Sequence, residues 1–186
     1  MRIIAGDLRG RAIRAPEGAA TRPTSDRARQ AVFNILEHAT WSEGIEGLRV
    51  IDVFAGSGAM GLEALSRGAA ACLFVENAAA ALSAIRANLD AFGLEGRGQI
   101  LRQDATKLSP LAAVEAPCDL AFLDPPYKKE LGAPALQALR AGGWLAPASV
   151  AVIEVGADEP DMAPPGFEVL DNRRYGAAKV LFLRPA

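Results

Sequence analysis

Alternating strand and helix patterns run through most of this chain and restrict its fold more than any other feature. Short apolar runs suited to buried strands occur at residues 48–55, 71–76, 98–104, 118–124 and 149–155. Helical patterns lie between them at residues 59–68, 78–93 and 133–143. The alternation predicts an α/β domain in which helices cover both faces of a mostly parallel sheet. Residues 167–185 form two extended runs around a short turn, which predicts an antiparallel last pair.

The N-terminal part differs from the rest in charge. Residues 1–30 contain seven Arg against three acidic residues, a net charge of +4, so the remainder carries −6 of the total of −2. RIIA and RAIR, on either side of GDLRG, predict a β-hairpin. We therefore expect a basic hairpin extension at residues 1–22 and a main domain at residues 23–186. Such a segment favours contact with a polyanion, although a solvated Arg-rich surface is the alternative.

Composition excludes several classes of protein. Hydrophobic residues make up 51% of the chain, which argues against global disorder. No run approaches the ~20 apolar residues of a membrane span, and the N-terminus lacks a signal-peptide pattern, so a cytoplasmic protein is expected. Cys72 and Cys118 lie in apolar runs and are expected to be buried thiols. The single histidine, His38, gives no basis for a histidine triad or a metal site.

A glycine-rich segment, DVFAGSGAMG, connects the first strand of the alternation to its helix. Gly56, Gly58 and Gly61 fit the pattern G-x-G-x-x-G in the strand–turn–helix context that gives this pattern meaning. Glu76 ends the next strand, twenty residues after Gly56, where a carboxylate can accept hydrogen bonds from ribose hydroxyls. The segment therefore predicts a site for an adenosine-containing cofactor.

Two further carboxylates bear on which cofactor this is. Asp52, just ahead of the glycines, suits the cationic amino group of S-adenosylmethionine and would repel the pyrophosphate of NAD. Asp104 ends the third strand and can accept from an adenine amino group, although a residue that only caps the strand end is the alternative.

The sequence Asp124-Pro125-Pro126-Tyr127 follows the fourth strand, at the same expected edge of the sheet. The carboxylate of Asp124 and the carbonyl of Pro125 offer two acceptors on a turn that the prolines stiffen. An exocyclic amine of a nucleobase would bind both acceptors, and its lone pair would become localised for attack on a methyl group. Tyr127 would stack on a flipped base and contribute about 1–3 kcal/mol. These residues predict N-methylation of an amino group on a planar ring.

Several segments together resemble one known family. DPPY and DVFAGSG are similar to motifs of the amino-methyltransferases that act on adenine, cytosine or guanine. MRIIAGDLRGRAIRAPEG, TRPTSDRARQAVFNIL and DVFAGSGAMGLEALSRGA resemble the bacterial RsmD family, which methylates guanine N2 in small-subunit (16S) ribosomal RNA. The resemblance covers essentially the whole chain, and TRPTSDR is its most specific part.

The resemblance implies a class I (Rossmann-like) S-adenosylmethionine methyltransferase with a seven-stranded sheet, an N-terminal hairpin that engages RNA, and no metal. We assign the site residues as follows. Cofactor binding is expected from Asp52, Phe54, Gly56, Gly58, Glu76 and Asp104. Action on the base is expected from Asp124, Pro125, Pro126 and Tyr127. Contact with 16S rRNA is expected from Arg9, Arg11, Arg14, Arg22 and Arg27. A monomer acting on a small-subunit assembly intermediate is the expected form.

Three alternatives remain open at the level of sequence. Asp-Pro-Pro-Tyr does not by itself name the base, so adenine N6 and cytosine N4 are rival targets. A nicotinamide-dependent dehydrogenase can use the same glycine loop, but it would lack an acid–base residue and leave Asp124 unexplained. A non-catalytic RNA-binding module could keep a decayed cofactor fold, against which the intact Asp124 and Glu76 argue.

Overall fold

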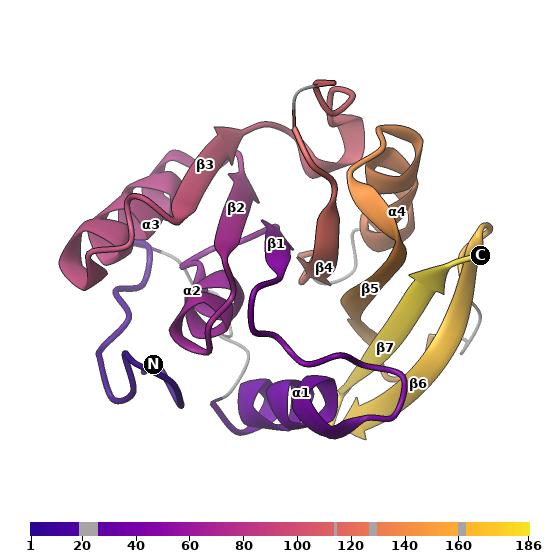
Figure 1. Cartoon of the computed structure of the whole chain (residues 1–186), viewed down its shortest axis with the longest axis horizontal. Coiled ribbons are helices and arrows are strands. Elements are labelled where there is room, and N and C mark those ends of the chain that lie inside the picture. Colours follow the sequence, from indigo (N-terminus) through magenta and orange to yellow (C-terminus); the bar gives the residue numbers. More distant parts are fainter. Residues whose placement is uncertain (19–25, 114, 127–129, 160–162) are drawn as a thin grey trace.

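A seven-stranded sheet forms the centre of the protein (Figure 1). The structure is a computed structural model and describes residues 1–18, 26–113, 115–126, 130–159 and 163–186. In chain order the strands are β1 (Arg49–Val53), β2 (Ala71–Glu76), β3 (Gly98–Arg102), β4 (Cys118–Leu123), β5 (Leu145–Gly156), β6 (Phe167–Tyr175) and β7 (Ala178–Pro185). Across the sheet their order is β3-β2-β1-β4-β5-β7-β6. The first five strands are parallel, and β7 is antiparallel to both β5 and β6, which confirms the predicted last pair.

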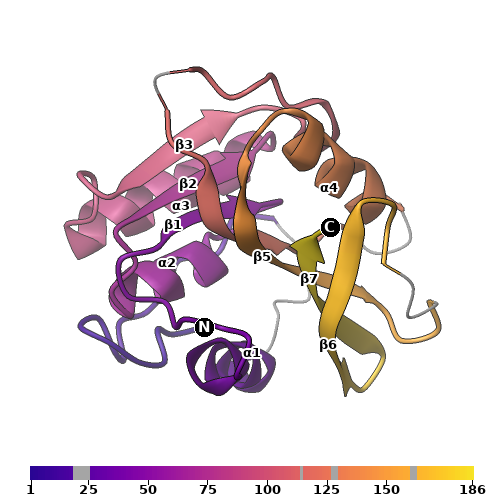
Figure 2. The same cartoon turned by 45° about the vertical axis from the view of Figure 1, so that its right-hand side comes forward.

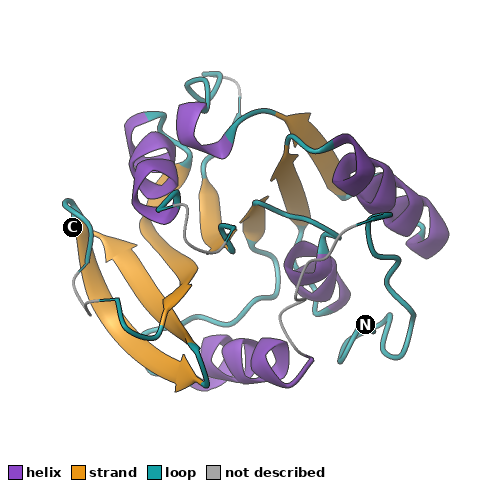
Figure 3. Cartoon of the chain, turned by 180° about the vertical axis from the view of Figure 1, so that it is seen from behind, coloured by secondary structure: helices purple, strands orange, loops and turns teal. Residues whose placement is uncertain are grey.

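Helices cover both faces of the sheet (Figures 2 and 3). They are α1 (Asp26–His38), α2 (Ala59–Ser66), α3 (Ala79–Phe92), the short 3-10 helix η1 (Ala105–Lys107) and α4 (Gly132–Ala141). Side chains of α1, α2 and α3 share one core cluster, whereas those of α4 belong to a second cluster on the opposite face. Within the described part of the chain, no helix combines the length and the apolar character that crossing a membrane requires.

The central strands are apolar because both of their faces are buried. Along β4, Leu120 and Phe122 belong to the first core cluster, and Ala121 and Leu123 to the second. Successive side chains of a strand point to opposite faces, so a central parallel strand needs an apolar residue at every position. The continuous hydrophobic runs of the sequence follow directly from this arrangement.

The chain crosses the sheet between β3 and β4. The strand β3 lies at one edge, whereas β4 pairs with β1 in the middle. The connections that follow β1 and β4 therefore lead away from each other toward opposite halves of the sheet. Ligands of open α/β sheets bind at such a switch point, beyond the carboxyl ends of the strands.

The predicted N-terminal hairpin is reduced to a single antiparallel bridge. Arg2 pairs with Ala12 in an isolated bridge, and neither side forms a regular strand. The segment nevertheless belongs to the main core, because Ile3 and Ile13 are buried in the cluster beneath α1–α3. The proposed boundary at residue 22 lies outside the described residues, so the division of the chain there stays a prediction.

Buried polar side chains of α2 and α3 hold the backbone of this N-terminal segment. Glu63 accepts hydrogen bonds from the N–H groups of Ile4 and Ala5, at 2.8 and 3.0 Å. Asn88 accepts from the N–H of Arg14 at 2.8 Å and donates to its C=O at 3.0 Å. The first fourteen residues are thus docked on the body of the protein and do not form a free arm.

The two cysteines are structural. Cys72 and Cys118 are both buried and unpaired, as the sequence predicted. Burial raises the pKa of Cys72 well above its ordinary value and that of Cys118 to about 11. Both thiols therefore stay protonated and unreactive near neutral pH.

Candidate active site

A tightly bent glycine loop follows β1. Phe54 has a φ of 58°, a left-handed conformation that a bulky residue rarely adopts. Gly56 and Gly58 have φ values of 56° and 79°, where glycine carries no steric penalty. A β-carbon at position 58 would also lie 3.1 Å from the ring of Phe74. The loop can therefore turn from β1 into α2 within a few residues only with glycines at these positions.

The third glycine of the motif serves the packing of α2 on the sheet. A β-carbon at Gly61 would lie 2.4 Å from Cε1 of Phe74 and 2.5 Å from Sγ of Cys72, both on β2. Only glycine permits this close approach of helix and strand, as expected for the last position of G-x-G-x-x-G. The predicted strand–turn–helix context of the motif is confirmed.

Glu76 stands at the end of β2 and connects to the glycine loop. Its Oε2 accepts a hydrogen bond from the N–H of Gly56 at 3.0 Å. Its Oε1 accepts from the N–H groups of Asn77 and Ala78, at 2.8 and 3.0 Å. The carboxylate is thus held rigidly beside the loop, and with about four lone-pair sites it can still accept from a ligand hydroxyl.

Asp52 is buried beneath the start of α2 at 3% relative exposure. Its Oδ2 accepts from the N–H of Gly61 at 2.9 Å. Burial raises the pKa of Asp52 from its ordinary 3.8 to about 8; the Gly61 bond opposes this shift, and the charges of Asp124 and Glu76 add to it. Three carboxylates therefore converge on the switch point, and their mutual repulsion would be relieved by a cation.

Asp104 lies beyond β3 and caps the short helix η1. Its Oδ1 accepts hydrogen bonds from the N–H and the hydroxyl of Thr106, at 2.9 and 2.7 Å. These two bonds lower the pKa of Asp104, because they favour the charged carboxylate. Asp104 therefore caps η1 through Oδ1, as the alternative to an adenine contact expected, and Oδ2 takes no part in these two bonds.

Asp124 directly follows β4, at the same edge as the glycine loop. Its N–H donates to the carbonyl of Val53 at 3.4 Å, so Asp124 stands beside the last residue of β1. The side chain is exposed, Pro125 is half-buried and Pro126 is exposed. Tyr127 lies outside the described residues. The structure thus brings Asp124 together with Asp52 and Glu76, which the sequence separates by 72 and 48 positions.

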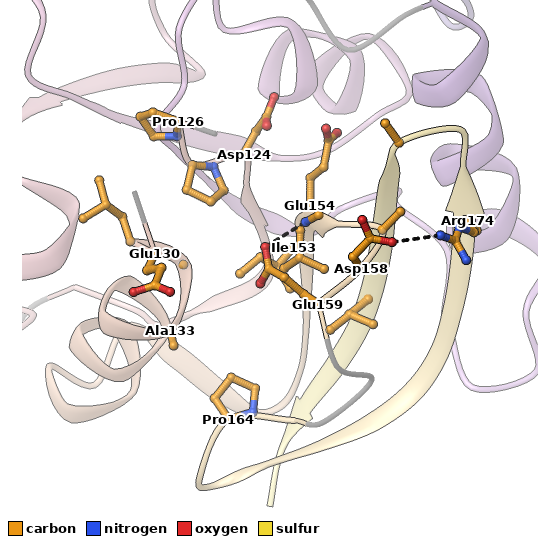
Figure 4. A pocket seen from close by; sticks show the side chains of 18 of the residues that line it. Asp124, Pro126, Glu130, Ala133, Ile153, Glu154, Asp158, Glu159, Pro164 and Arg174 are labelled. Atoms are coloured by element: carbon orange, nitrogen blue, oxygen red, sulfur yellow. Dashed lines mark hydrogen bonds and ion pairs between the residues drawn. The ribbon is translucent and has the colours of Figure 1, made fainter. Parts of the chain in front are cut away.

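Two clefts meet at Asp124, and Figure 4 shows the larger of them. The larger encloses about 700 Å³ between the start of α4, the carboxyl end of β5 and the amino end of β7. Acidic side chains from Glu130, Asp158 and Glu159 line it. The smaller is a narrow crevice toward α1 with largely apolar walls, formed by residues such as Ala28, Val32, Met60 and Val180. Asp124 and Glu154 line both clefts.

Most of the predicted RNA-binding arginines are at the surface. Exposed positions on the N-terminal segment and on α1 are Arg9, Arg14 and Arg27. Arg11 is also exposed, but its guanidinium donates to the carbonyl of Ala91 at 2.5 Å and lies 5.0 Å from the ring centre of Phe92. Arg22 is outside the described residues. Arg11 is thus partly used in attaching the segment to α3.

Sequence reasoning missed two residues of this region. Glu154 follows the apolar part of β5 as Asp124 follows that of β4, and this parallel position was the signal that could have revealed it. Asn88 donates to the carbonyl of Ser57 at 3.1 Å and so connects the glycine loop to the N-terminal segment. Nothing in the sequence distinguishes Asn88 from an ordinary residue of α3.

Comparison with known proteins agrees with this arrangement. The family model described as "Conserved hypothetical protein 95" matches residues 1–184. Ribosomal RNA small subunit methyltransferase D of Escherichia coli K12 is 36% identical over 154 residues, 83% of this chain and 74% of that protein. The protein of the same name from Haemophilus influenzae is 30% identical over 178 residues, 95% of this chain and 89% of that one.

Solved structures share the whole fold. The E. coli protein yhhF, provisionally described as a methyltransferase, gives a TM-score of 0.81 at 28% identity, covering 100% of this chain and 97% of that one. Strand order, the antiparallel β7 and the glycine loop at the switch point define a class I, Rossmann-like S-adenosylmethionine methyltransferase fold. Within that class, the chain belongs to the RsmD family.

Proposed function

We propose that this protein transfers a methyl group from S-adenosylmethionine to the exocyclic N2 amine of a guanine in 16S rRNA. The observation that carries the proposal is the position of Asp124 at the switch point, beside β1 and near the carboxylates of Asp52 and Glu76. Membership of the RsmD family supports rRNA methylation, since the relatives from E. coli and H. influenzae are named for it.

The residues around the glycine loop fit the cofactor. Gly56 and Gly58, with the bent Phe54 between β1 and the loop, allow the backbone to approach a ligand closely. Glu76 would hold the ribose and Asp104 the adenine amine. Asp52 and its acidic neighbours favour a cationic ligand over a pyrophosphate, which fits S-adenosylmethionine and argues against NAD. When bound, S-adenosylmethionine supplies a sulfonium methyl group that a nitrogen lone pair displaces, leaving a neutral thioether.

Asp124 and Pro125 would prepare the amine. The carboxylate of Asp124 accepts one N–H of the amine and the carbonyl of Pro125 accepts the other, so the nitrogen is drawn out of conjugation with the ring. As the new N–C bond forms the nitrogen must lose one proton, and the Asp124 carboxylate is positioned to accept it. Pro126 stiffens the turn, and Tyr127 is proposed as the stacking face for the base.

The RNA would extend from this site across the N-terminal surface. The exposed Arg9, Arg14 and Arg27 would contact phosphates, and Arg22 is proposed to join them. Arg11 would contribute less, because its guanidinium already bonds the end of α3. We further propose a cytoplasmic monomer that acts on an assembly intermediate of the small ribosomal subunit.

The test is to separate chemistry from cofactor binding at Asp124. Small ribosomal subunits that lack base methylation are incubated with labelled S-adenosylmethionine and either wild-type protein or D124A. Methyl transfer should fall by about 10³-fold or more in the variant, whereas the calorimetric Kd for the cofactor should change less than about threefold. The matched control is D119A, because Asp119 lies at the other end of β4. This variant should keep the wild-type rate of methyl transfer. A large loss of cofactor affinity in D124A would remove Asp124 from its proposed role.

A further inference from the structure

Glu154 and Asp124 occupy equivalent positions on neighbouring strands. In the parallel pair of β4 and β5, Leu123 stands opposite Ile153, and Asp124 and Glu154 are the residues that directly follow this pair. Neighbouring strands lie about 4.8 Å apart, and residues in register direct their side chains to the same face. Figure 4 shows the two carboxylates side by side, both pointing away from Glu130 and Pro164. Asp124 therefore has a second carboxylate next to it.

We propose that Glu154 selects guanine by accepting the hydrogen bond of its ring N1–H, while Asp124 holds the neighbouring N2 amine. This inference rests on the proposed function and adds the reason for its choice of base. Two carboxylates at adjacent positions require two adjacent groups of donors. The edge of guanine that carries N1–H and the N2 amine has this arrangement.

The other amino-bearing bases lack the second donor. Beside the N6 amine of adenine stands N1, and beside the N4 amine of cytosine stands N3; both ring nitrogens are acceptors. Either one would place a lone pair against the half-buried Glu154 carboxylate, which would then receive no hydrogen bond from the base. Such mismatches are costly, and a site built around a donor rejects analogues that lack it by several orders of magnitude.

The surroundings of Glu154 favour a donor-rich ligand edge. The larger cleft that it lines also contains the carboxylates of Glu130, Asp158 and Glu159. Arg174, from the same cleft, pairs with Asp158 at 3.5 Å. On the other side, the narrow crevice offers mainly apolar walls. Asp124 and Glu154 line both clefts and thus place two acceptors where the clefts join, which favours a ligand edge that carries donors.

The experiment compares two RNAs that differ only at the target base. The target guanosine, once mapped, is replaced by 2-aminopurine, which keeps the N2 amine but has an unprotonated N1 and lacks the O6 oxygen. Because Glu154 is proposed to meet N1 and not O6, the response of the E154Q variant separates these two changes. Wild-type protein should methylate the guanosine RNA at least about a hundredfold faster in kcat/KM. The E154Q variant presents an amide that can donate or accept, so its rate on guanosine should fall and the ratio should shrink to within about tenfold.

A matched control comes from the same cleft. Glu159 accepts from the N–H of Gly156 at 2.8 Å, and E159Q keeps that carbonyl acceptor, so its ratio should equal that of wild-type protein. Cofactor affinity of E154Q, measured by calorimetry, verifies that the variant is folded. Equal rates of the wild type on both RNAs, or an unchanged ratio in folded E154Q, would overturn the role of Glu154. Absence of N2-methylguanosine with the wild type would instead overturn the proposed function itself.

Discussion

Two buried carboxylates, Glu63 on α2 and Asp52 on β1, have opposite surroundings. Glu63, fully buried, contacts the guanidinium groups of Arg67 at 2.8 Å and Arg29 at 3.6 Å, besides the two backbone amides of the N-terminal segment. Asp52, at 3% exposure, receives a hydrogen bond from Gly61 and faces the charges of Asp124 and Glu76. One carboxylate is surrounded by cations and the other by acids.

The difference separates a structural carboxylate from one suited to ligand binding. Burying a charge is costly unless a partner of opposite sign accompanies it. The body of the protein supplies the partners of Glu63, which joins α1, α2 and the N-terminal segment. Asp52 lies in a cluster of acids at the switch point, where a cationic ligand would supply the missing charge.

The largest effect is expected from removing Glu63. In E63A the buried guanidinium groups of Arg29 and Arg67 would lose their shared buried carboxylate and keep only the more exposed Asp26 and Glu37, which should lower the free energy of unfolding by about 3–5 kcal/mol. Urea denaturation followed by circular dichroism measures this loss. The control is E37A, which removes a more exposed partner of Arg67 and should cost less than about 1 kcal/mol. Equal losses in both variants would contradict the structural role of Glu63.

Replacing Asp52 should raise the stability relative to wild type, in contrast to the loss in E63A, and the gain should depend on pH. Because its folded pKa is raised to about 8, the folded state keeps a proton that the unfolded chain loses above about pH 4. The wild type therefore loses stability as the pH rises from that value toward about 8. D52N lacks this loss, so its stability relative to wild type should rise by about 2–3 kcal/mol between about pH 5 and pH 7.

Paired urea titrations of wild type and D52N at several pH values measure this difference, because contributions of all other groups cancel. A difference that does not change with pH would refute the shifted pKa. The same variant should bind S-adenosylmethionine more weakly than wild type, since a cationic ligand can displace the proton of Asp52 and pair with the carboxylate, whereas an amide cannot ionise. Tighter binding of S-adenosylmethionine by D52N would show that the cationic group of the cofactor does not lie beside Asp52.

Glu76 should affect the cofactor more than the fold. E76A removes the proposed ribose acceptor and releases the N–H of Gly56, so the Kd for S-adenosylmethionine should rise by about 10–100-fold. Isothermal titration calorimetry gives this value directly. The control, E95A, alters an exposed carboxylate just beyond α3 and should leave the Kd unchanged. Unaltered binding in E76A would withdraw the ribose assignment.

The smallest change in total affinity is expected at the N-terminal surface. Replacing both Arg9 and Arg14 by Ala should weaken RNA binding and reduce the slope of log K against log salt by about 1–2. Filter binding at a series of salt concentrations measures the slope. The control is R49A, at the amino end of β1 and far along the strand from the switch point, which should keep the wild-type slope. An unchanged slope in the double variant would return these arginines to a purely solvated role.

Sequence patterns predicted the parts of the structure that depend on local chemistry. The apolar runs predicted β1–β5, most clearly the central β1 and β4, which are buried on both faces, and the glycine spacing predicted the loop because Gly61 must pack against β2. The docking of the N-terminal segment was not predictable, since it depends on side chains such as Glu63 and Asn88 that lie more than fifty residues away. The pairing of Asp124 with Glu154 likewise depends on strand register, which sequence alone did not give.

The central claim is the identity of the methylated atom. Small subunits lacking base methylation are treated with wild-type protein and labelled S-adenosylmethionine, and the RNA is digested to nucleosides and separated by chromatography. The account predicts that the label elutes as N2-methylguanosine. Label in N6-methyladenosine or N4-methylcytidine would contradict both the guanine assignment and the role of Glu154, while the amine chemistry of Asp124 would stand.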